Sequence, residues 1–405
     1  MTEKRIDNPQ ATRPRALNGG KDGSSVSARE ALSTERGIPG TIHHPPQGVA
    51  AELSAKLAAR SRHVCLLLGA GAGRSAGLPD LRGLEEVVVN AIQGADGELV
   101  KGLLDGRNLE DALSRLRSIK ALVHGGGCFD SFDYASASRI DTAICQAIIE
   151  AVSTPDMALE SFYRLGSWAA RGDYHLPIEI FTINYDLLVE TGLEQVGAPF
   201  FDGFVGHLRA RFRADLVEAV DTSEPNRLPS SFVRLWKLHG STNWIFDHAE
   251  GQRIVRTGRP AANEEAVAIY PSEEKYDDSR RVPFVVLMDR FRRALATPET
   301  ILLVNGYSFG DQHLNEIIFD AAHQYPRSET VALCYGDIPE AVLSQAPITR
   351  NLTVLAACEA IIGGQRGDWV GDEDIPGVWK DGRFLLGDFR YFSVFLDRKP
   401  AGEDG

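Results

Sequence analysis

The hydrophobic positions along the chain follow two recurring patterns. Several apolar runs have the length of strands and are continuous rather than alternating, which is typical of strands buried on both faces of a sheet. These runs are Val64–Leu68, Ile178–Ile183, Val233–Leu238, Ile301–Val304, Val331–Cys334 and Leu352–Leu355. In other stretches, such as Phe284–Leu295 and Leu314–Ala321, apolar residues recur every three or four positions, as in helices. Strands that alternate with helices predict an α/β fold with a doubly wound parallel sheet.

The same patterns divide the chain into regions. Residues 1–47 are rich in Gly, Pro, Ser and charge and lack apolar periodicity, which predicts a disordered tail. Residues 48–362 form the expected main domain, with structure beginning near Val49. Residues from about 85 to 170 are helical in pattern and predict a helical insertion in that domain. The segment 363–405 mixes Gly, Asp and aromatic residues and is expected to dock on the core.

Charge and apolar content restrict the possible partners. The chain has 43 Lys and Arg against 56 Asp and Glu, a formal net charge of −13. Such a surface repels a phosphate backbone, so direct nucleic-acid binding is not expected. Arg209, Arg211 and Arg213 could form a local basic patch, although a solvated helix face is the favoured interpretation. No stretch approaches the roughly 18 apolar residues of a membrane span, and the first residues lack the apolar core of a signal peptide.

The five cysteines indicate a reducing compartment, and the cytoplasm fits best. Their number is odd and no two form a C-x-x-C pair, so neither a disulfide framework nor a sulfur-bound zinc is predicted. Cys65, Cys145, Cys334 and Cys358 lie in apolar runs and are expected to be small core residues.

A glycine-rich motif follows the first strand run, in the sequence L-L-L-G-A-G-A-G-R-S-A-G-L-P-D-L-R of residues 66–82. Glycines at such a turn let the backbone approach a pyrophosphate, and free N–H groups there attract its charge, as in Rossmann-like sheets. Arg74 stands in the place of the third glycine of a dinucleotide fingerprint, so a tight turn without a ligand is an equal interpretation of this motif alone. The candidate binding residues in it are Gly69, Ala70, Gly71, Ser75, Asp80 and Arg82.

Two further motifs stand at the carboxyl ends of strands, where open α/β sheets bind ligands. Thr182, Asn184 and Asp186 belong to the sequence F-T-I-N-Y-D after the second run. His239 belongs to K-L-H-G-S after the third. The alternatives are that Asn184 and Asp186 merely cap the next helix and that His239 is structural.

A fourth motif, N-G-Y-S-F-G-D, occupies residues 305–311 between a strand and a helix. Gly306 and Ser308 make it a candidate second turn for a phosphate or a ribose. The alternative is a plain connection between the two elements.

In this order, the four motifs resemble those of the sirtuins, over roughly residues 50–360. The first is similar to the sirtuin signature G-A-G-x-S-x-x-x-G-I-P-D-F-R, with Gly73 in place of the first serine and Leu81 in place of the phenylalanine. The others resemble T-x-N-x-D, L-H-G and the loop that holds the adenosine side of NAD+. The residues of the motifs are most similar to those of the divergent sirtuin-like branch of bacterial anti-phage defence, where T-x-N-Y-D, L-H-G-S and G-Y-S-F-x-D recur.

This resemblance implies NAD+ as the substrate and Asn184 and His239 as the catalytic residues. Asn184 would orient the ribose and the attacking water, Asp186 would hold the nicotinamide carboxamide, and His239 would act as base or hydrogen-bond acceptor. The glycine-rich turn with Ala70, together with Thr182, Gly306 and Ser308, would bind the dinucleotide. Asp80 and Arg82 would lie on a loop that closes over it.

One departure from the family bears on the reaction. Deacylating sirtuins carry a four-cysteine zinc module between the L-H-G motif and the adenosine loop, whereas residues 240–333 of this chain contain no cysteine. We therefore expect no zinc, and an NAD+ glycohydrolase that depletes NAD+ in abortive anti-phage defence. An NAD-dependent protein deacylase and a non-catalytic module that binds NAD or ADP-ribose are the alternatives. Because an enzyme that can exhaust NAD+ must stay silent until it is triggered, we expect a homo-oligomer. The resemblance implies control by a partner and, because the chain ends soon after this domain, a separate HerA-type ATPase.

Overall fold

The computed structural model describes residues 42–153, 158–218, 231–247, 253–261, 267–269 and 282–398. The chain divides into two units, Met1–Gly40 and Thr41–Gly405, and the description below concerns the second. The predicted disordered tail falls, up to residue 41, outside the described residues.

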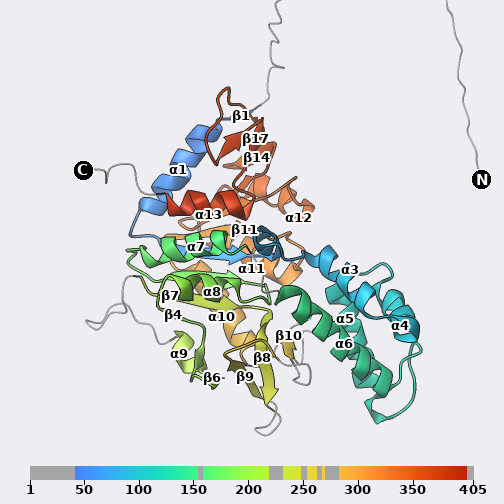
Figure 1. Cartoon of the computed structure of the whole chain (residues 1–405). Coiled ribbons are helices and arrows are strands. Elements are labelled where there is room, and N and C mark those ends of the chain that lie inside the picture. The colour runs from blue at the N-terminus through green and yellow to red at the C-terminus, as the bar shows by residue number, and fades with distance from the viewer. Residues whose placement is uncertain are drawn as a thin grey trace, which may run out of the picture. The chain divides into compact units, whose positions relative to one another are not determined.

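A large sheet runs through the unit (Figure 1), and in the described ranges it has ten strands. In spatial order they are β1 (His43–His44), β15 (Gln365–Trp369), β14 (Glu359–Ile362), β13 (Leu352–Leu355), β12 (Glu329–Leu333), β11 (Thr300–Asn305), β2 (His63–Leu68), β3 (Ile178–Thr182), β7 (Val233–Lys237) and β4 (Phe200–Phe201). From β13 to β4 every neighbouring pair is parallel, whereas β14 is antiparallel to both of its neighbours. The six strands expected from continuous apolar runs are all present.

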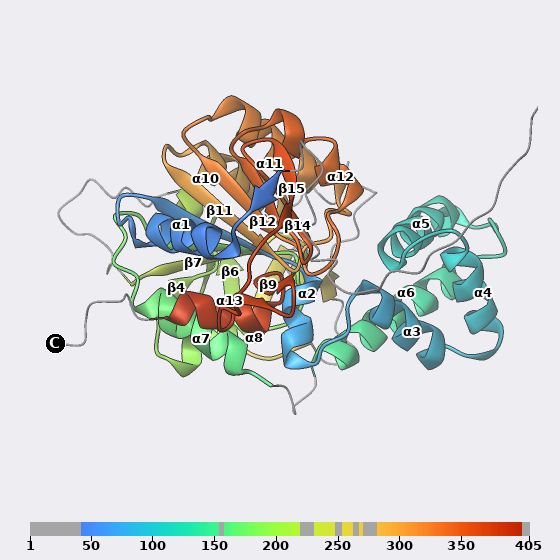
Figure 2. The same cartoon turned by 90° about the horizontal axis from the view of Figure 1, so that it is seen from above.

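Helices cover both faces of this sheet (Figure 2). Strand β2 shows why its run is continuous: Leu66 and Leu68 pack in one hydrophobic cluster, and Cys65 and Leu67 pack in the other. The first cluster includes residues of α1 (Pro46–Ala58), α7 (Glu160–Ala170), α8 (Leu188–Gln195) and α13 (Phe389–Asp397). The second includes residues of α10 (Phe284–Ala296), α11 (Gln312–Gln324) and α12 (Glu340–Leu343). The prediction of a doubly wound α/β fold is confirmed.

Residues 81–152 form a group of helices beside the sheet (Figures 1 and 2), hereafter the helical segment. Asp80 and Asn108 cap two of these helices by accepting a hydrogen bond from a backbone N–H of the first turn, and Asp133 forms a capping box with Ser136. The helices of the segment are α3 (Leu81–Ala91), α4 (Gly94–Leu104), α5 (Leu109–Leu122) and α6 (Tyr134–Val152). The helical insertion was expected over about 85–170, whereas α3 already begins at Leu81 and α7 follows the segment along the chain.

A second, antiparallel sheet was not expected from the sequence. Its strands, in spatial order, are β10 (Val267–Ile269), β8 (Gly240–Asp247), β9 (Arg253–Thr257), β6 (Arg209–Phe212) and β5 (Phe204–Val205). The helix expected around Arg209 and Arg211 is therefore wrong, because both residues belong to β6 and pair with Thr257 and Val255 of β9. Arg209 pairs with Asp247 at 3.0 Å, and Arg213, just after the strand, pairs with Asp215 at 2.6 Å.

Both ends of the described chain join the main sheet. Structure begins before the expected boundary at residue 48, since β1 and α1 start at His43 and Pro46. Strand β1 pairs with β15, a contact between distant residues that local patterns do not reveal. Beyond residue 362, β15 extends the sheet, a hairpin of β16 (Trp379–Lys380) and β17 (Arg383–Phe384) follows, and α13 packs on α7.

Two further expectations concern burial and length. Cys65, Cys145 and Cys334 are buried as expected, but Cys358 is exposed because it lies in the turn between β13 and β14. Among the helices that the structure describes, none is both long and apolar enough to cross a membrane.

Candidate active site

The order of the strands reverses between β2 and β11. From β2 the chain continues to β3 and β7 on one side, and later returns to β11, β12 and β13 on the other. Loops diverge at such a switch point, and open α/β sheets bind ligands there, at the carboxyl ends of the strands. The glycine-rich motif follows β2 and the N-G-Y-S-F-G-D motif follows β11, so the two candidate binding loops meet at this point.

These two loops touch through their backbones. The Gly69 N–H donates to the Asn305 carbonyl oxygen at 3.0 Å, and the Gly71 N–H donates to the Gly306 carbonyl oxygen at 2.8 Å. A Cβ on Gly69 would lie 2.5 Å from that same Gly306 oxygen. Gly306 itself has a φ of 68°, and a Cβ there would lie 2.3 Å from the Ala72 nitrogen. Glycine is therefore required at these positions by the packing of one loop on the other.

Asn184 is held against the glycine-rich loop. The Thr182 hydroxyl donates to the Leu68 carbonyl oxygen at 3.0 Å and accepts from the Asn184 N–H at 3.0 Å. The Asn184 side-chain amide then donates to the Gly69 carbonyl oxygen at 3.1 Å. These contacts fix the amide at the edge of the sheet beside the switch point.

His239 lies at the same edge, one strand further along. Thr182 pairs with Lys237 in the register of β3 and β7, so Asn184 and His239 each come two residues after a paired position. The Leu238 N–H donates to the Thr182 carbonyl oxygen at 2.8 Å, which carries the pairing up to the histidine. Neighbouring strands lie about 4.8 Å apart, so the structure brings the two predicted catalytic residues to adjacent positions.

A carboxylate that the sequence analysis did not select faces His239. The His239 Nε2 lies 3.2 Å from Asp311 Oδ2, and both side chains are buried. A carboxylate in this position fixes the orientation and tautomer of an imidazole. Asp311 was quoted only as the last residue of the fourth motif, and its place directly after a strand-end loop is the signal that could have identified it.

The loop after β11 holds Asp311 in place. The other carboxylate oxygen, Oδ1, caps α11 by accepting from the N–H groups of His313 at 2.8 Å and Leu314 at 3.3 Å. The Tyr307 hydroxyl reaches the Asp311 carbonyl oxygen at 3.0 Å and the Asn315 side-chain oxygen at 2.9 Å. The carboxylate that faces His239 is thus set by a helix cap and a buried tyrosine.

Asp186 is buried, two residues after Asn184. Its Oδ1 accepts from the Leu188 N–H at 3.0 Å, and a Cβ on Gly73 would lie 3.6 Å from its Oδ2. Burial raises the pKa of Asp186, and the positive charge of Lys237 opposes that rise. The Lys237 ammonium donates to the Asp186 carbonyl oxygen and to Glu190 Oε1. Asp186 therefore lies next to the glycine-rich loop, as a ligand-binding role requires.

The remaining predicted residues make local contacts. The Ser75 hydroxyl donates to the Ala72 carbonyl oxygen at 2.8 Å. Asp80 caps α3 and pairs with Arg74 at 2.7 Å. Ala70 opens the short helix α2 (Ala70–Gly73). Arg82 and Ser308 are exposed.

The helical segment contributes a second carboxylate, Glu110, which the sequence analysis did not select. Glu110 is half-buried near the start of α5. Burial raises its pKa; a protonated His239 would lower it, and the negative charge of Asp311 raises it further. No local sequence signal marks Glu110, because it lies far along the chain from the four motifs.

Two other features do not belong to this site. In the part of the chain that the structure describes, no group of three or more His, Cys, Asp or Glu side chains is arranged to hold a metal ion.

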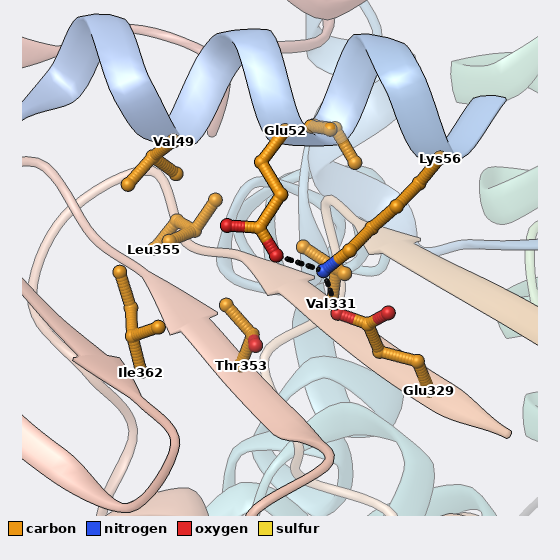
Figure 3. Close-up of a pocket in the computed structure, with 9 residues that line it drawn as sticks. Val49, Glu52, Lys56, Glu329, Val331, Thr353, Leu355 and Ile362 are labelled. Carbon is orange, nitrogen blue, oxygen red and sulfur yellow. Dashed lines mark hydrogen bonds and ion pairs between the residues drawn. The ribbon is translucent and has the colours of Figure 1, made fainter. Parts of the chain in front are cut away.

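A pocket between α1 and strands β12 and β13 (Figure 3) is lined by Val49, Leu355 and Ile362 and by the Lys56 ammonium, which pairs with Glu52 and Glu329. It contains none of the predicted site residues.

The comparisons with known proteins support part of the resemblance. Residues 178–351 match the model of a family described as SIR2-like domain. The match covers fewer than half of the 405 residues and includes Asn184, His239 and Gly306, but not the glycine-rich loop. A crystal structure of a Sir2 homolog–NAD complex is 12% identical to the chain, with a TM-score of 0.42, over 78% of this chain and 91% of that one. No curated protein matches the chain.

Proposed function

We propose that the chain is an NAD+ glycohydrolase that releases nicotinamide and ADP-ribose. The observation that carries the proposal is that Asn184 and His239 follow the carboxyl ends of two adjacent strands, next to the switch point where two glycine loops meet. The likeness of residues 178–351 to SIR2-like domains supports NAD+ as the substrate.

The residues of this site suit each step of the hydrolysis. The bond between nicotinamide and the anomeric carbon breaks, and the pyridine nitrogen takes the electron pair. A water oxygen bonds to the same carbon, and its proton passes to a base. In the proposal, Asn184 orients the ribose and the water, Asp186 holds the carboxamide, and His239, held by Asp311, accepts a hydrogen bond or the proton.

Two rival functions use the same loops. A protein deacylase would move the acyl group of an acyl-lysine peptide onto the ADP-ribosyl group of NAD+, but the chain has no cysteine between residues 240 and 333 to build the zinc module of those enzymes. We accordingly expect metal analysis of the purified protein to find no stoichiometric zinc. A non-catalytic module would bind NAD or ADP-ribose and turn nothing over.

The biological setting is proposed on the resemblance alone. NAD+ depletion in the cytoplasm would serve abortive anti-phage defence, and such an enzyme must stay silent until it is triggered. A homo-oligomer joined by a separate HerA-type ATPase would provide that control. Particle mass with and without the ATPase tests this part, and an unregulated monomer would contradict it.

The purified full-length chain, incubated with NAD+, tests the reaction. Nicotinamide and ADP-ribose are measured by chromatography with and without an acetyl-lysine peptide. Nicotinamide release that does not depend on the peptide supports the hydrolase. Release that requires the peptide would establish the deacylase instead, and NAD+ binding without turnover would establish the module.

A further inference from the structure

A buried lysine contacts the loop that presents Asn184 and Asp186. Lys237 is the last residue of β7, and its side chain is only 2% exposed. It pairs with Thr182 in the register of β3 and β7, and the Thr182 hydroxyl already holds the start of the loop at the Asn184 N–H. Lysine is almost never buried to this extent unless its charge is paired and hydrogen-bonded. The partners of Lys237 therefore show what its ammonium group holds.

The Lys237 ammonium holds the end of the same loop by its backbone. It donates to the Asp186 carbonyl oxygen and to Glu190 Oε1 of α8, the latter at 3.0 Å. The carboxylate of Asp186 is fixed as well, since its Oδ1 accepts from the Leu188 N–H at 3.0 Å. One buried cation thus joins β7, the Asp186 backbone and the first helix after the loop.

The charge of Lys237 acts on Asp186 in addition to its hydrogen bond. Burial raises the pKa of Asp186, and the negative charge of Glu190 raises it further. Lys237 supplies the positive charge that opposes this rise. Removing the ammonium would therefore favour the neutral, protonated form of Asp186.

We propose that Lys237 is a positioning residue, which holds Asp186 by its backbone and keeps its carboxylate an acceptor for the carboxamide of NAD+. The burial of Lys237 and its hydrogen bond to the Asp186 carbonyl oxygen carry this inference. The role of Asp186 belongs to the proposed function, so the kinetic test rests on that function. An ionised carboxylate accepts from the carboxamide NH2 group and repels a second carboxylate.

The main variant is Lys237→Met/Glu190→Gln, which removes both charges and so leaves no unpaired charge buried. It should lower kcat/KM for nicotinamide release by about tenfold, the scale of one hydrogen bond to a charged group. Glu190→Gln alone keeps the bond from Lys237 to Asp186 and should stay within about threefold of wild type. Lys56→Met is the matched control, because it removes a half-buried ammonium that pairs with two carboxylates outside the site, and it should leave kcat/KM unchanged.

Substrate discrimination provides a readout that a purely structural role would not change. The nicotinic acid analogue of NAD+ has a carboxylate in place of the carboxamide, so the ionised Asp186 of the wild type should disfavour it. In the double variant, the ratio of kcat/KM for NAD+ to that for the analogue should fall by about tenfold, whereas Glu190→Gln should keep it. Equal losses for the two dinucleotides, or a double variant as fast as Glu190→Gln, would overturn the proposal.

Hydrogen exchange of the NAD-free protein separates this inference from the proposed function. Relative to the core amides of β2, the Leu188 N–H should exchange about tenfold faster in the double variant and at the wild-type rate in Glu190→Gln. If the wild-type chain fails to hydrolyse NAD+, the proposed function is wrong while the anchoring of Asp186 can still be observed. Unchanged exchange at Leu188 in the double variant rejects the anchoring whatever the enzyme does.

Discussion

The main sheet contains two buried histidines that face a carboxylate, one at each end of its strands. His63 opens β2 at the amino end and lies 3.0 Å from Glu179 Oε1. His239 follows β7 at the carboxyl end and lies 3.2 Å from Asp311 Oδ2. By residue type and distance the two pairs are almost the same.

Their surroundings are opposite in charge. Glu179 also accepts from Arg290 Nε at 2.8 Å and from the Trp236 indole at 2.6 Å, and Arg234 lies 3.7 Å away. Burial alone would raise the pKa of Glu179, but the bonds and charges of Arg290 and His63 outweigh it and hold that pKa well below its usual range.

Around the carboxyl end the charge is negative, since burial and the charge of Asp311 raise the pKa of Glu110. A carboxylate surrounded by donors contributes to stability, whereas an acid with a raised pKa beside a histidine at a strand end is typical of a functional site. If the proposed function holds, the histidine–carboxylate pair at the amino end serves stability and the pair at the carboxyl end serves chemistry.

The largest effect should come from Glu179→Gln. The substitution leaves two arginines and a histidine facing an uncharged amide, and breaking a buried ion pair in this way costs about 3–5 kcal/mol of unfolding free energy. Turnover per folded molecule should stay unchanged. Urea unfolding measures the loss, with the exposed Glu98→Gln as control. A loss below about 1 kcal/mol would show that the network is not structural.

His239→Ala and Asn184→Ala should have the opposite effect to Glu179→Gln, lowering activity while stability is kept. Each should lower nicotinamide release by about 10²-fold or more, since a positioned acid–base or orienting group is lost, with little change in thermal stability. The exposed residues His175 and Asn90 provide alanine controls that should keep full activity. If both active-site variants fold and keep normal turnover, the chemistry lies elsewhere.

Asp311→Asn should give a smaller loss of kcat, about tenfold, because the negative charge facing His239 disappears. Asparagine is also a good helix cap, so α11 should keep its stability. Asp388→Asn changes a cap of the same kind on α13, outside the site, and serves as the control. Equal kcat values for the two variants would mean that Asp311 acts only as a cap.

The smallest predicted effect is on the pH dependence of stability. The pKa of Glu179 is lower in the folded chain than in the unfolded chain, so its contribution is complete above about pH 4.5 and is lost as the pH falls further. The stability difference between wild type and Glu179→Gln should therefore shrink by about 1 kcal/mol between pH 4.5 and 3.5. A difference that stays constant over this range would contradict the lowered pKa.

The sequence predicted the centre of the fold because both faces of those strands are buried. A run such as Ile301–Val304 admits only apolar residues on either side, and that constraint is visible locally. Strands such as β6 have exposed arginines and short lengths, so their pattern resembles a helix face. The pairing of β1 with β15 depends on contacts between residues far apart in the sequence.

The residues of the candidate site also differ in whether the sequence could predict them. Asn184 and His239 follow predicted strands within short motifs, so the sequence places both at the carboxyl ends of strands, and the pairing of β3 with β7 makes them neighbours. The contribution of Glu110 depends on how the helical segment packs, which no spacing of residues encodes. Asp311 is intermediate, because the motif containing it was identified while its contact with His239 depends on the sheet order.

The contact between the Gly69–Gly71 turn and Gly306 has a consequence for sequence change. A methyl group on Gly69 or Gly306 would enter the opposite loop, at 2.5 Å or 2.3 Å from its backbone. A side chain at either glycine must push the two loops apart. Once they are apart, a side chain at the other glycine no longer clashes with the opposite backbone. The double variant should then cost less than the sum of the single ones. Natural replacements at these positions should consequently occur together, so that two turns far apart in the sequence covary as one unit.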